Sequence, residues 1–207
     1  KTKPFVILAG ISGTGKTQLA RKFACAINAK CELIPVKPDW TDNSDLIGYV
    51  DIDNKFKKKA IVRIVERATV NPDKIYIVLL DEMNLARVEH YFSDFLSIIE
   101  TREYAGNRIV TNNLITDENF TGEEDLKKLI IPDNLYVVGT VNMDETTHPF
   151  SRKVLDRANS IELNEVNLDW ENKTSENMEE LKGINNEFLK AKYIHYKDLP
   201  ENEKEYC

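Results

Sequence analysis

A short stretch near the start of the chain combines glycines, a lysine and a hydroxyl residue at a spacing that suits phosphate binding. Gly10 to Thr17 reads Gly-Ile-Ser-Gly-Thr-Gly-Lys-Thr and fits G-x-x-x-x-G-K-T throughout. Glycines let backbone N–H groups turn toward phosphate oxygens, and the start of a following helix adds partial positive charge. We expect Lys16 to reach the β- and γ-phosphates and Thr17 to bind Mg²⁺. The candidate phosphate-binding residues are Gly10, Ser12, Gly13, Thr14, Gly15, Lys16, Thr17 and Gln18.

Two consecutive acids follow the most apolar segment of the chain. Asp81 and Glu82 come directly after the run Ile75 to Leu80. Beside Thr17, the Asp81 carboxylate is suited to order the Mg²⁺ shell. Glu82 is suited to polarise an attacking water as a general base. A helix cap at the end of a strand would use the same two acids, and this alternative stays open on the residues alone.

Two later side chains are candidates for contacts with a γ-phosphate. Asn142 ends the apolar run Leu135 to Val141, and its neutral amide is suited to contact that phosphate or orient the water. Arg157 lies in a short helical segment, from which it is suited to reach the phosphate of a neighbouring subunit. Each has an equally good structural explanation. Asn142 fits an ordinary turn, and Arg157 fits a surface ion pair to Asp156 or Glu162.

The elements that must position these residues alternate between strands and helices. Short apolar runs bounded by glycine or proline predict strands over 5–9, 31–36, 75–80, 135–141 and 160–163. Apolar residues at helical spacing predict helices over 18–27, 58–69, 90–100 and 150–158. The run 75–80 is apolar on both faces, as in a central strand of a covered parallel sheet. The predicted fold is a three-layer α/β sandwich with a mostly parallel sheet.

The composition changes near Glu165, beyond which Asn, Glu and Lys dominate. We therefore expect one domain over 1–165 and a partial helical extension over 166–207. The helical face of that extension is marked by Leu181, Ile184, Phe188 and Leu189. Within the first domain, the polar residues 106–124 predict a surface loop or hairpin. The lysines at 55 and 57–59 predict a solvated helix start, with contact to a polymer as the alternative.

Composition also limits the class of protein. The 207 residues carry 28 basic and 35 acidic side chains, so the charge of −7 disfavours non-specific nucleic-acid binding. No apolar run approaches the roughly 18–20 residues of a membrane span. Cys25, Cys31 and Cys207 lack metal-site spacing and suit reduced thiols, which predicts a cytoplasmic protein without a membrane partner. The absence of an initial Met predicts a piece of a longer protein.

Together these motifs resemble the AAA+ ATPases, most closely the McrB-like branch related to MoxR and dynein-type modules. The resemblance extends from Phe5 to about Leu163. It rests on five segments in order: Gly10–Thr17 resembles the Walker A loop, Asp45–Tyr49 the segment after the second strand, Leu79–Glu89 the extended Walker B segment with Asn84 and Arg87, Ile131–Asn142 the sensor 1 strand, and Phe150–Leu163 the arginine-finger segment.

The resemblance implies a P-loop NTPase sandwich that hydrolyses a nucleoside triphosphate with Mg²⁺. Carried over by position, Asn142 falls on the sensor 1 asparagine and Arg157 on the finger arginine. The family further implies a homo-oligomer, commonly a hexameric ring with nucleotide between subunits. For this branch it implies a nuclease partner subunit in a restriction or defence system, with any nucleic acid bound by other domains.

Two departures from the family pattern refine these expectations. Met143 to Thr147 differ from the Asn-Thr-Ala-Asp signature of the GTP-hydrolysing type, which favours ATP as the cofactor and leaves GTP as the alternative. Asn167 to Cys207 contain no arginine, so the sensor 2 position of a helical lid is not recognisable and we expect most of the lid to be missing.

Two other functions remain open. A small-molecule phosphotransferase would use the same glycine loop, but the Asp81-Glu82 pair argues against it. A scaffold that binds nucleotide only to assemble would not need Glu82 as a base. Phosphate release without an acceptor other than water separates the first alternative from a hydrolase, and a Glu82→Gln variant separates the second.

Overall fold

The computed structural model describes residues 4–106, 108–116, 120–121, 123–143, 147–163 and 186–189. Among them, five strands form one sheet in the order β2-β5-β8-β1-β9, and each neighbouring pair runs parallel. The predicted strands are confirmed with ends shifted by at most one residue. Their bounds are β1 (Phe5–Gly10), β2 (Lys30–Pro35), β5 (Tyr76–Asp81), β8 (Leu135–Asn142) and β9 (Asn159–Leu163).

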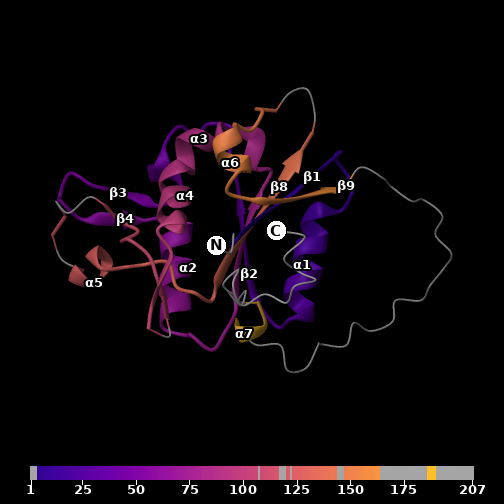
Figure 1. Cartoon of the computed structure of the whole chain (residues 1–207). Coiled ribbons are helices and arrows are strands. Elements are labelled where there is room, and N and C mark those ends of the chain that lie inside the picture. The colour runs from indigo at the N-terminus through magenta and orange to yellow at the C-terminus, as the bar shows by residue number, and fades with distance from the viewer. Residues whose placement is uncertain are drawn as a thin grey trace.

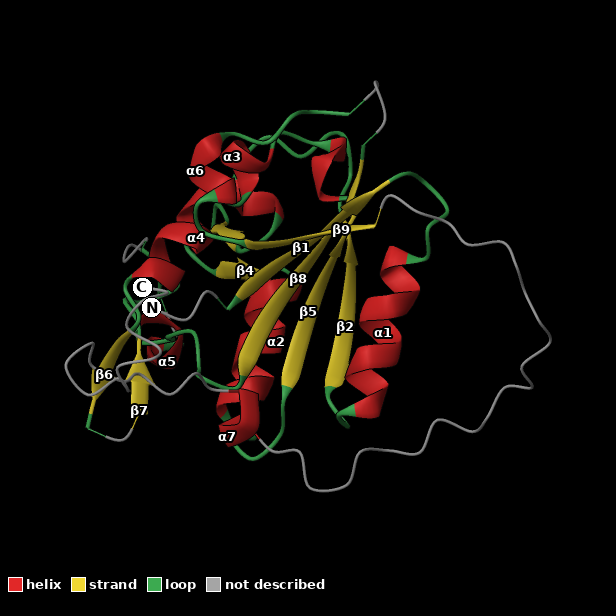
Figure 2. Ribbon diagram, turned by 45° about the vertical axis from the view of Figure 1, so that its right-hand side comes forward, coloured by secondary structure: helices red, strands yellow, loops and turns green. Residues whose placement is uncertain are grey.

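Helices cover both faces of this sheet (Figures 1 and 2). Helix α1 (Lys16–Ala26) lies on one face, and α2 (Ala60–Thr69), α3 (Val88–Tyr91) and α4 (Ser93–Glu100) lie on the other. Strand β5 serves both layers, because Val78 and Leu80 join the α2–α4 side whereas Ile77 and Leu79 pack on the α1 side. This explains why its sequence is apolar without alternation. The three-layer α/β prediction is confirmed.

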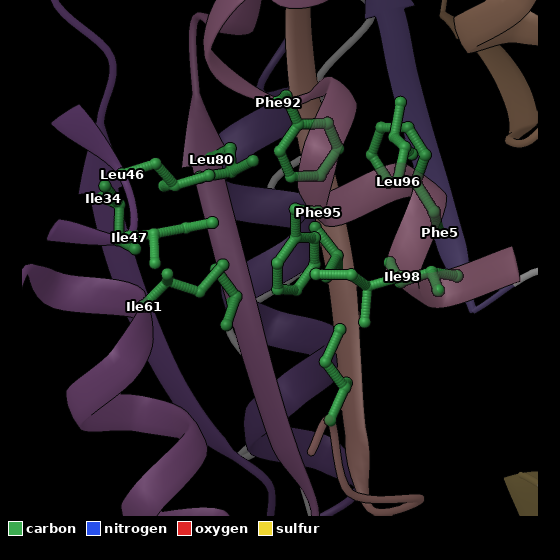
Figure 3. Close-up of a cluster of buried hydrophobic side chains, with 14 of the residues drawn as sticks. Phe5, Ile34, Leu46, Ile47, Ile61, Leu80, Phe92, Phe95, Leu96 and Ile98 are labelled. Carbon is green, nitrogen blue, oxygen red and sulfur yellow. The ribbon is translucent and has the colours of Figure 1, made fainter. Parts of the chain in front are cut away.

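The larger core lies between the sheet and α2–α4 and is built around aromatic rings (Figure 3). The ring of Phe92 lies 5.3 Å from the rings of both Phe5 and Phe95, and all three side chains are fully buried. Phe92 also separates α3 from α4, so the single helix predicted over 90–100 is divided. The break allows the adjacent side chains of Tyr91 and Phe92 to be buried together, which an unbroken helix would place about 100° apart.

A hairpin precedes α2 where the sequence predicted a helix start. Strand β3 (Gly48–Val50) pairs with β4 (Phe56–Lys58) in antiparallel fashion, after a short 3-10 helix over Asn43–Asp45. The prediction of a solvated helix start is therefore wrong, since α2 begins only at Ala60. Lys57 forms an ion pair with Asp51 at 3.1 Å, and Lys58 with Glu66 at 2.9 Å and Glu123 at 2.7 Å.

The polar stretch 106–124 belongs to a segment tied to this hairpin. It contains β7 (Arg108–Val110), which pairs with β6 (Glu103–Ala105), and it leads into α5 (Glu124–Lys127). Phe120 is buried with its ring 5.3 Å from that of Phe56, and the Thr121 backbone N–H donates to the Asn54 carbonyl over 2.7 Å. A hairpin is thus present, and the segment around Phe120 is packed onto the domain.

Two short helices complete the described chain. Helix α6 (Arg152–Leu155) leads into β9, and α7 (Asn186–Leu189) packs near the amino end of β8. The Tyr136 hydroxyl donates to Asn186 Oδ1 over 2.8 Å, and Leu189 packs beside Ile27 and Ile77. The expected boundary near Glu165, the side chains of Leu181 and Ile184, and that of Phe188 lie outside what the structure describes. Within the described ranges, no helix combines the length and apolar character that a membrane crossing requires.

Candidate nucleotide-binding site

The glycine loop connects β1 to α1 at the end of the sheet where the parallel strands terminate, which is the upper end in Figure 2. Gly13 and Gly15 have positive φ angles of 84° and 80°, conformations that other residues adopt only with strain. Gly10 has no room for a side chain, because an added Cβ would overlap the carbonyl oxygen of Leu163 on β9. The glycines therefore allow the tight path of the loop and its close approach to the edge strand.

Lys16 places a buried ammonium inside this loop. Its side chain is 5% exposed, and Nζ donates to the carbonyl oxygens of Gly10 at 3.0 Å and Ile11 at 2.6 Å. The Thr14 hydroxyl also donates to the Ile11 carbonyl, at 2.9 Å, which tightens the turn. Positive charge and the first N–H groups of α1 therefore meet at one point, the arrangement that binds phosphate. Ser12 and Gln18 are exposed on either side of this point.

The two predicted metal ligands, Thr17 in α1 and Asp81 at the end of β5, are in contact. The Thr17 hydroxyl donates to Asp81 Oδ1 over 2.6 Å, although the two residues are 64 positions apart. A hydroxyl and a carboxylate are both hard oxygen donors, the kind that Mg²⁺ prefers. The two side chains therefore fit a Mg²⁺ ion next to the phosphate-binding loop.

The predicted catalytic acid and sensor amide also meet. Glu82 adopts a left-handed backbone conformation with φ of 54°, which turns its side chain away from the direction of Asp81. Asn142, at the end of β8, donates from Nδ2 to Glu82 Oε1 over 2.9 Å. The sequence placed these residues at the ends of two strands, and the sheet order makes those strands neighbours.

Two residues that support this pair were not among the predicted site residues. Asn84, which is 3% exposed, donates from Nδ2 to the Asn142 carbonyl over 2.6 Å and accepts the Asn142 backbone N–H at 3.3 Å. Thr140 is 1% exposed and contacts both acids through its hydroxyl. Asn84 was named only as part of the segment Leu79–Glu89 that resembles the extended Walker B segment. For Thr140 the only signal was a hydroxyl residue within an apolar run, two positions before Asn142.

Arg157 lies apart from the loop of its own chain. Its Nε forms an ion pair with Glu100 Oε1 at 2.5 Å, a partner that the sequence did not indicate. Asn159 pairs with Val6 of β1, about 13 Å along the strand from Gly10. Arg157 lies two residues before Asn159, and the contact described for its guanidinium is with Glu100 rather than with the phosphate-binding loop.

A second layer of contacts holds the segment after Glu82. The Tyr91 hydroxyl donates to the Met83 carbonyl over 2.9 Å, and burial raises the pKa of Tyr91 far above its ordinary value, so it stays protonated. Glu89 accepts the Ser151 backbone N–H at 2.7 Å, linking α3 to the start of α6. Burial raises the pKa of Glu89, but hydrogen bonds from its own backbone and from Ser151 outweigh this and keep its pKa below the ordinary value.

Comparison with known proteins identifies a family for most of this chain. Residues 5–158 match the family described as AAA domain, dynein-related subfamily. The type IV methyl-directed restriction enzyme EcoKMcrB subunit of Escherichia coli strain K12 is 25% identical over 147 residues, covering 68% of this chain and 30% of the relative.

Two solved structures are also similar. A candidate ATPase from Cytophaga hutchinsonii has a TM-score of 0.41 and 21% identity, covering 77% of this chain and 42% of that one. PCH-2 from C. elegans has a TM-score of 0.40 and 17% identity, covering 78% and 35%. The chain thus spans less than half the length of each of these relatives.

The fold and the family match define a nucleotide-binding protein of the P-loop class. The chain belongs to the AAA+ ATPase family, within its McrB-like, dynein-related branch.

Proposed function

We propose that this domain hydrolyses ATP with Mg²⁺ and that hydrolysis drives rearrangement of a homo-oligomer, with a hexameric ring as the expected form. The observation that carries the proposal is that two hydrogen-bonded pairs of side chains lie close together at one end of the sheet. Thr17 contacts Asp81, and Asn142 contacts Glu82. One pair offers ligands for a metal ion and the other offers a base with its orienting amide.

Each residue has a defined part in this proposal. The backbone of Gly10, Ser12, Gly13, Thr14 and Gly15 binds phosphate oxygens together with Lys16, and Gln18 lies at the first turn of α1. Thr17 and Asp81 hold Mg²⁺, which supplies charge neutralisation of the phosphates. Glu82 takes a proton from the attacking water, and Asn142 orients that water or contacts the γ-phosphate.

Arg157 is proposed to act on the nucleotide of a neighbouring subunit. Two observations support action in trans: Arg157 pairs with Glu100 in its own chain, and the nearby Asn159 pairs at Val6, about 13 Å along β1 from Gly10. With this ion pair formed, the Arg157 side chain is 28% exposed. A structural ion pair is the competing explanation, and the two make different predictions for Glu100 variants.

The domain division stays part of the proposal. Residues 1–165 would form the large subdomain and 166–207 part of a helical lid. Helix α7 packs beside Tyr136, about 20 Å along β8 from Asn142. Any covering of the nucleotide therefore has to come from residues other than Asn186–Leu189.

The wider role is inferred from relatives. The similarity to a restriction enzyme subunit supports a cytoplasmic restriction or defence assembly with a nuclease partner subunit, in which nucleic acid is bound by other domains. ATP is preferred over GTP in this proposal, because the residues after Asn142 differ from the signature of the GTP-hydrolysing type.

The first experiment is phosphate release with ATP and with GTP over a protein concentration series, for wild type and Glu82→Gln. Specific activity is expected to rise with concentration, to require Mg²⁺, and to be higher with ATP. Glu82→Gln is expected to bind ATP with little turnover. Equal turnover by Glu82→Gln and wild type would instead identify a site in which Glu82 is not the base.

A further inference from the structure

We propose that Thr140 is a positioning residue that holds both acids of the site through one hydroxyl; this inference rests on the proposed function and concerns the same site. Thr140 Oγ1 donates to Asp81 Oδ1 over 2.8 Å and accepts the Glu82 backbone N–H at 2.9 Å. A hydroxyl has one proton to donate, so this pattern of donor and acceptor is the only one that satisfies both contacts.

The position of Thr140 follows from the parallel register of the sheet. Leu80 of β5 pairs with Gly139 of β8, so Asp81 and Thr140 come next on adjacent strands. Leu8 of β1 pairs with Thr140 and packs in the layer on the α1 side, where Thr17 begins its helix. The Thr140 hydroxyl therefore lies next to Asp81 and the Glu82 backbone, on the same side of the sheet as Thr17, and the residue is 1% exposed.

The two contacts have different consequences. Asp81 Oδ1 accepts hydroxyl protons from Thr17 and from Thr140. Of these two donors, Thr17 is itself a proposed metal ligand, so Thr140 is the one that can orient the carboxylate without taking part in binding. The second contact fixes the peptide of Glu82 in a left-handed conformation, from which its carboxylate reaches Asn142. Loss of the hydroxyl is therefore expected to disturb the Asp81 ligand and the Glu82 base together.

The chain offers a matched set of variants. Thr140→Val keeps the shape and removes the hydroxyl, whereas Thr140→Ser keeps the hydroxyl and removes the methyl group. Thr69→Val is the control for the chemical change itself, because the exposed Thr69 also donates a hydroxyl hydrogen bond, to the Val65 carbonyl at 2.8 Å, at the end of α2 and away from the site. Thr140→Ala replaces Thr140→Val if the latter does not fold.

The measurements include two that do not depend on turnover. Hydrogen exchange of the Glu82 amide in the nucleotide-free protein is expected to be at least tenfold faster in Thr140→Val than in wild type. Binding of a fluorescent ATP analogue is expected to lose its Mg²⁺-dependent enhancement by about tenfold, with binding in EDTA unchanged. Phosphate release is expected to fall at least tenfold. Thr140→Ser is expected to stay near wild type in all three, as is Thr69→Val.

The outcomes separate this inference from the function on which it rests. If wild type hydrolyses ATP and Thr140→Val matches it in turnover, Mg²⁺ dependence and Glu82 exchange, the inference is overturned and the function stands. If Thr140→Ser is as impaired as Thr140→Val, packing of the methyl group and not the hydroxyl is responsible, and the inference is again overturned. If wild type hydrolyses no nucleotide, the proposed function fails, and the exchange and Mg²⁺-binding measurements alone decide the role of Thr140.

Discussion

The side-chain amide of Asn142 donates to the carboxylate of Glu82 over 2.9 Å and so joins the ends of β8 and β5. The contact is between the proposed general base and the residue proposed to contact the γ-phosphate. The amide nitrogen of Asn142 carries a second N–H, which is the one proposed to contact the γ-phosphate while the first holds Glu82. Through Asn142, the position of the Glu82 carboxylate is therefore coupled to the position of the γ-phosphate.

The first prediction concerns this pair. Glu82→Gln is expected to lower kcat by about 10²–10⁴, the usual contribution of a general base. Asn142→Ala is expected to lower kcat by about tenfold or more. Because the two side chains act as a unit, the double variant should lose much less than the product of the single losses. Single-turnover phosphate release measures all three, and multiplicative losses would show that the two residues act independently.

The second prediction separates the two explanations of Arg157. Arg157→Ala is expected to lower kcat by about 10³, the scale of an arginine finger, whereas Glu100→Gln should stay within about twofold because it keeps the guanidinium. Mixing Arg157→Ala with Glu82→Gln should restore phosphate release, since each variant supplies what the other lacks. Equal losses in Arg157→Ala and Glu100→Gln would instead indicate that the ion pair is the only role of Arg157.

The third prediction concerns the buried amide of Asn84. Asn84→Ala is expected to lower the free energy of unfolding by about 1–3 kcal/mol, because the Asn142 backbone loses buried partners. It should also lower kcat, since it releases the main chain of Asn142. Asn134→Ala is the control. Asn134 is fully buried and donates to the carbonyls of Ala68, Asn71 and Lys74, remote from the site.

Urea unfolding and steady-state kinetics distinguish these two variants. Both should be destabilised, but only Asn84→Ala should lose activity in the remaining folded protein. A kcat for Asn84→Ala equal to that of Asn134→Ala would assign Asn84 a purely structural part.

The fourth prediction is a pH dependence of stability from Glu89. Its pKa in the folded protein is below the ordinary value of 4.5, so its ionised form stabilises the fold. This contribution is fully present above about pH 4.5 and is lost as the pH falls through the lower folded pKa. Glu89→Gln should therefore be less stable than wild type at pH 7, and the difference should shrink below pH 4. Urea midpoints at both pH values measure this, and a difference that does not vary with pH contradicts it.

The fifth prediction concerns packing beneath Glu82. A Cβ at Gly139 would overlap the Met83 sulfur, which is fully buried. Gly139→Ala should lower stability by about 1–3 kcal/mol through overpacking. Met83→Ala gives the methyl group space, so the double variant should lose less stability than the sum of the two single losses. Thermal unfolding of the single and double variants measures this. Additive losses would mean that the two side chains do not compete for this space.

Much of the fold was predictable because its signals are local. The glycine loop is one continuous motif. The strand over 75–80 is apolar on both faces, which indicated that it lies inside the sheet with helices on both sides. The hairpin of β3 and β4 was not predicted, since Gly48–Val50 and Phe56–Lys58 are too short and too polar to show strand alternation. The helix over 90–100 was predicted as one unit, because helical periodicity does not reveal a break that serves to bury two adjacent aromatic rings.

The sequence alone determined which residue types are available for phosphate, metal and water chemistry, because those residues lie in short contiguous motifs or directly after apolar strands. Only the tertiary structure decided which of them meet. Glu82 and Thr140 are 58 positions apart, as are Asn84 and Asn142, and no spacing rule predicts their contact. The order of the parallel sheet places β5 beside β8, and its register brings their carboxyl ends to the same level. The partners of buried hydroxyls and amides follow from that register.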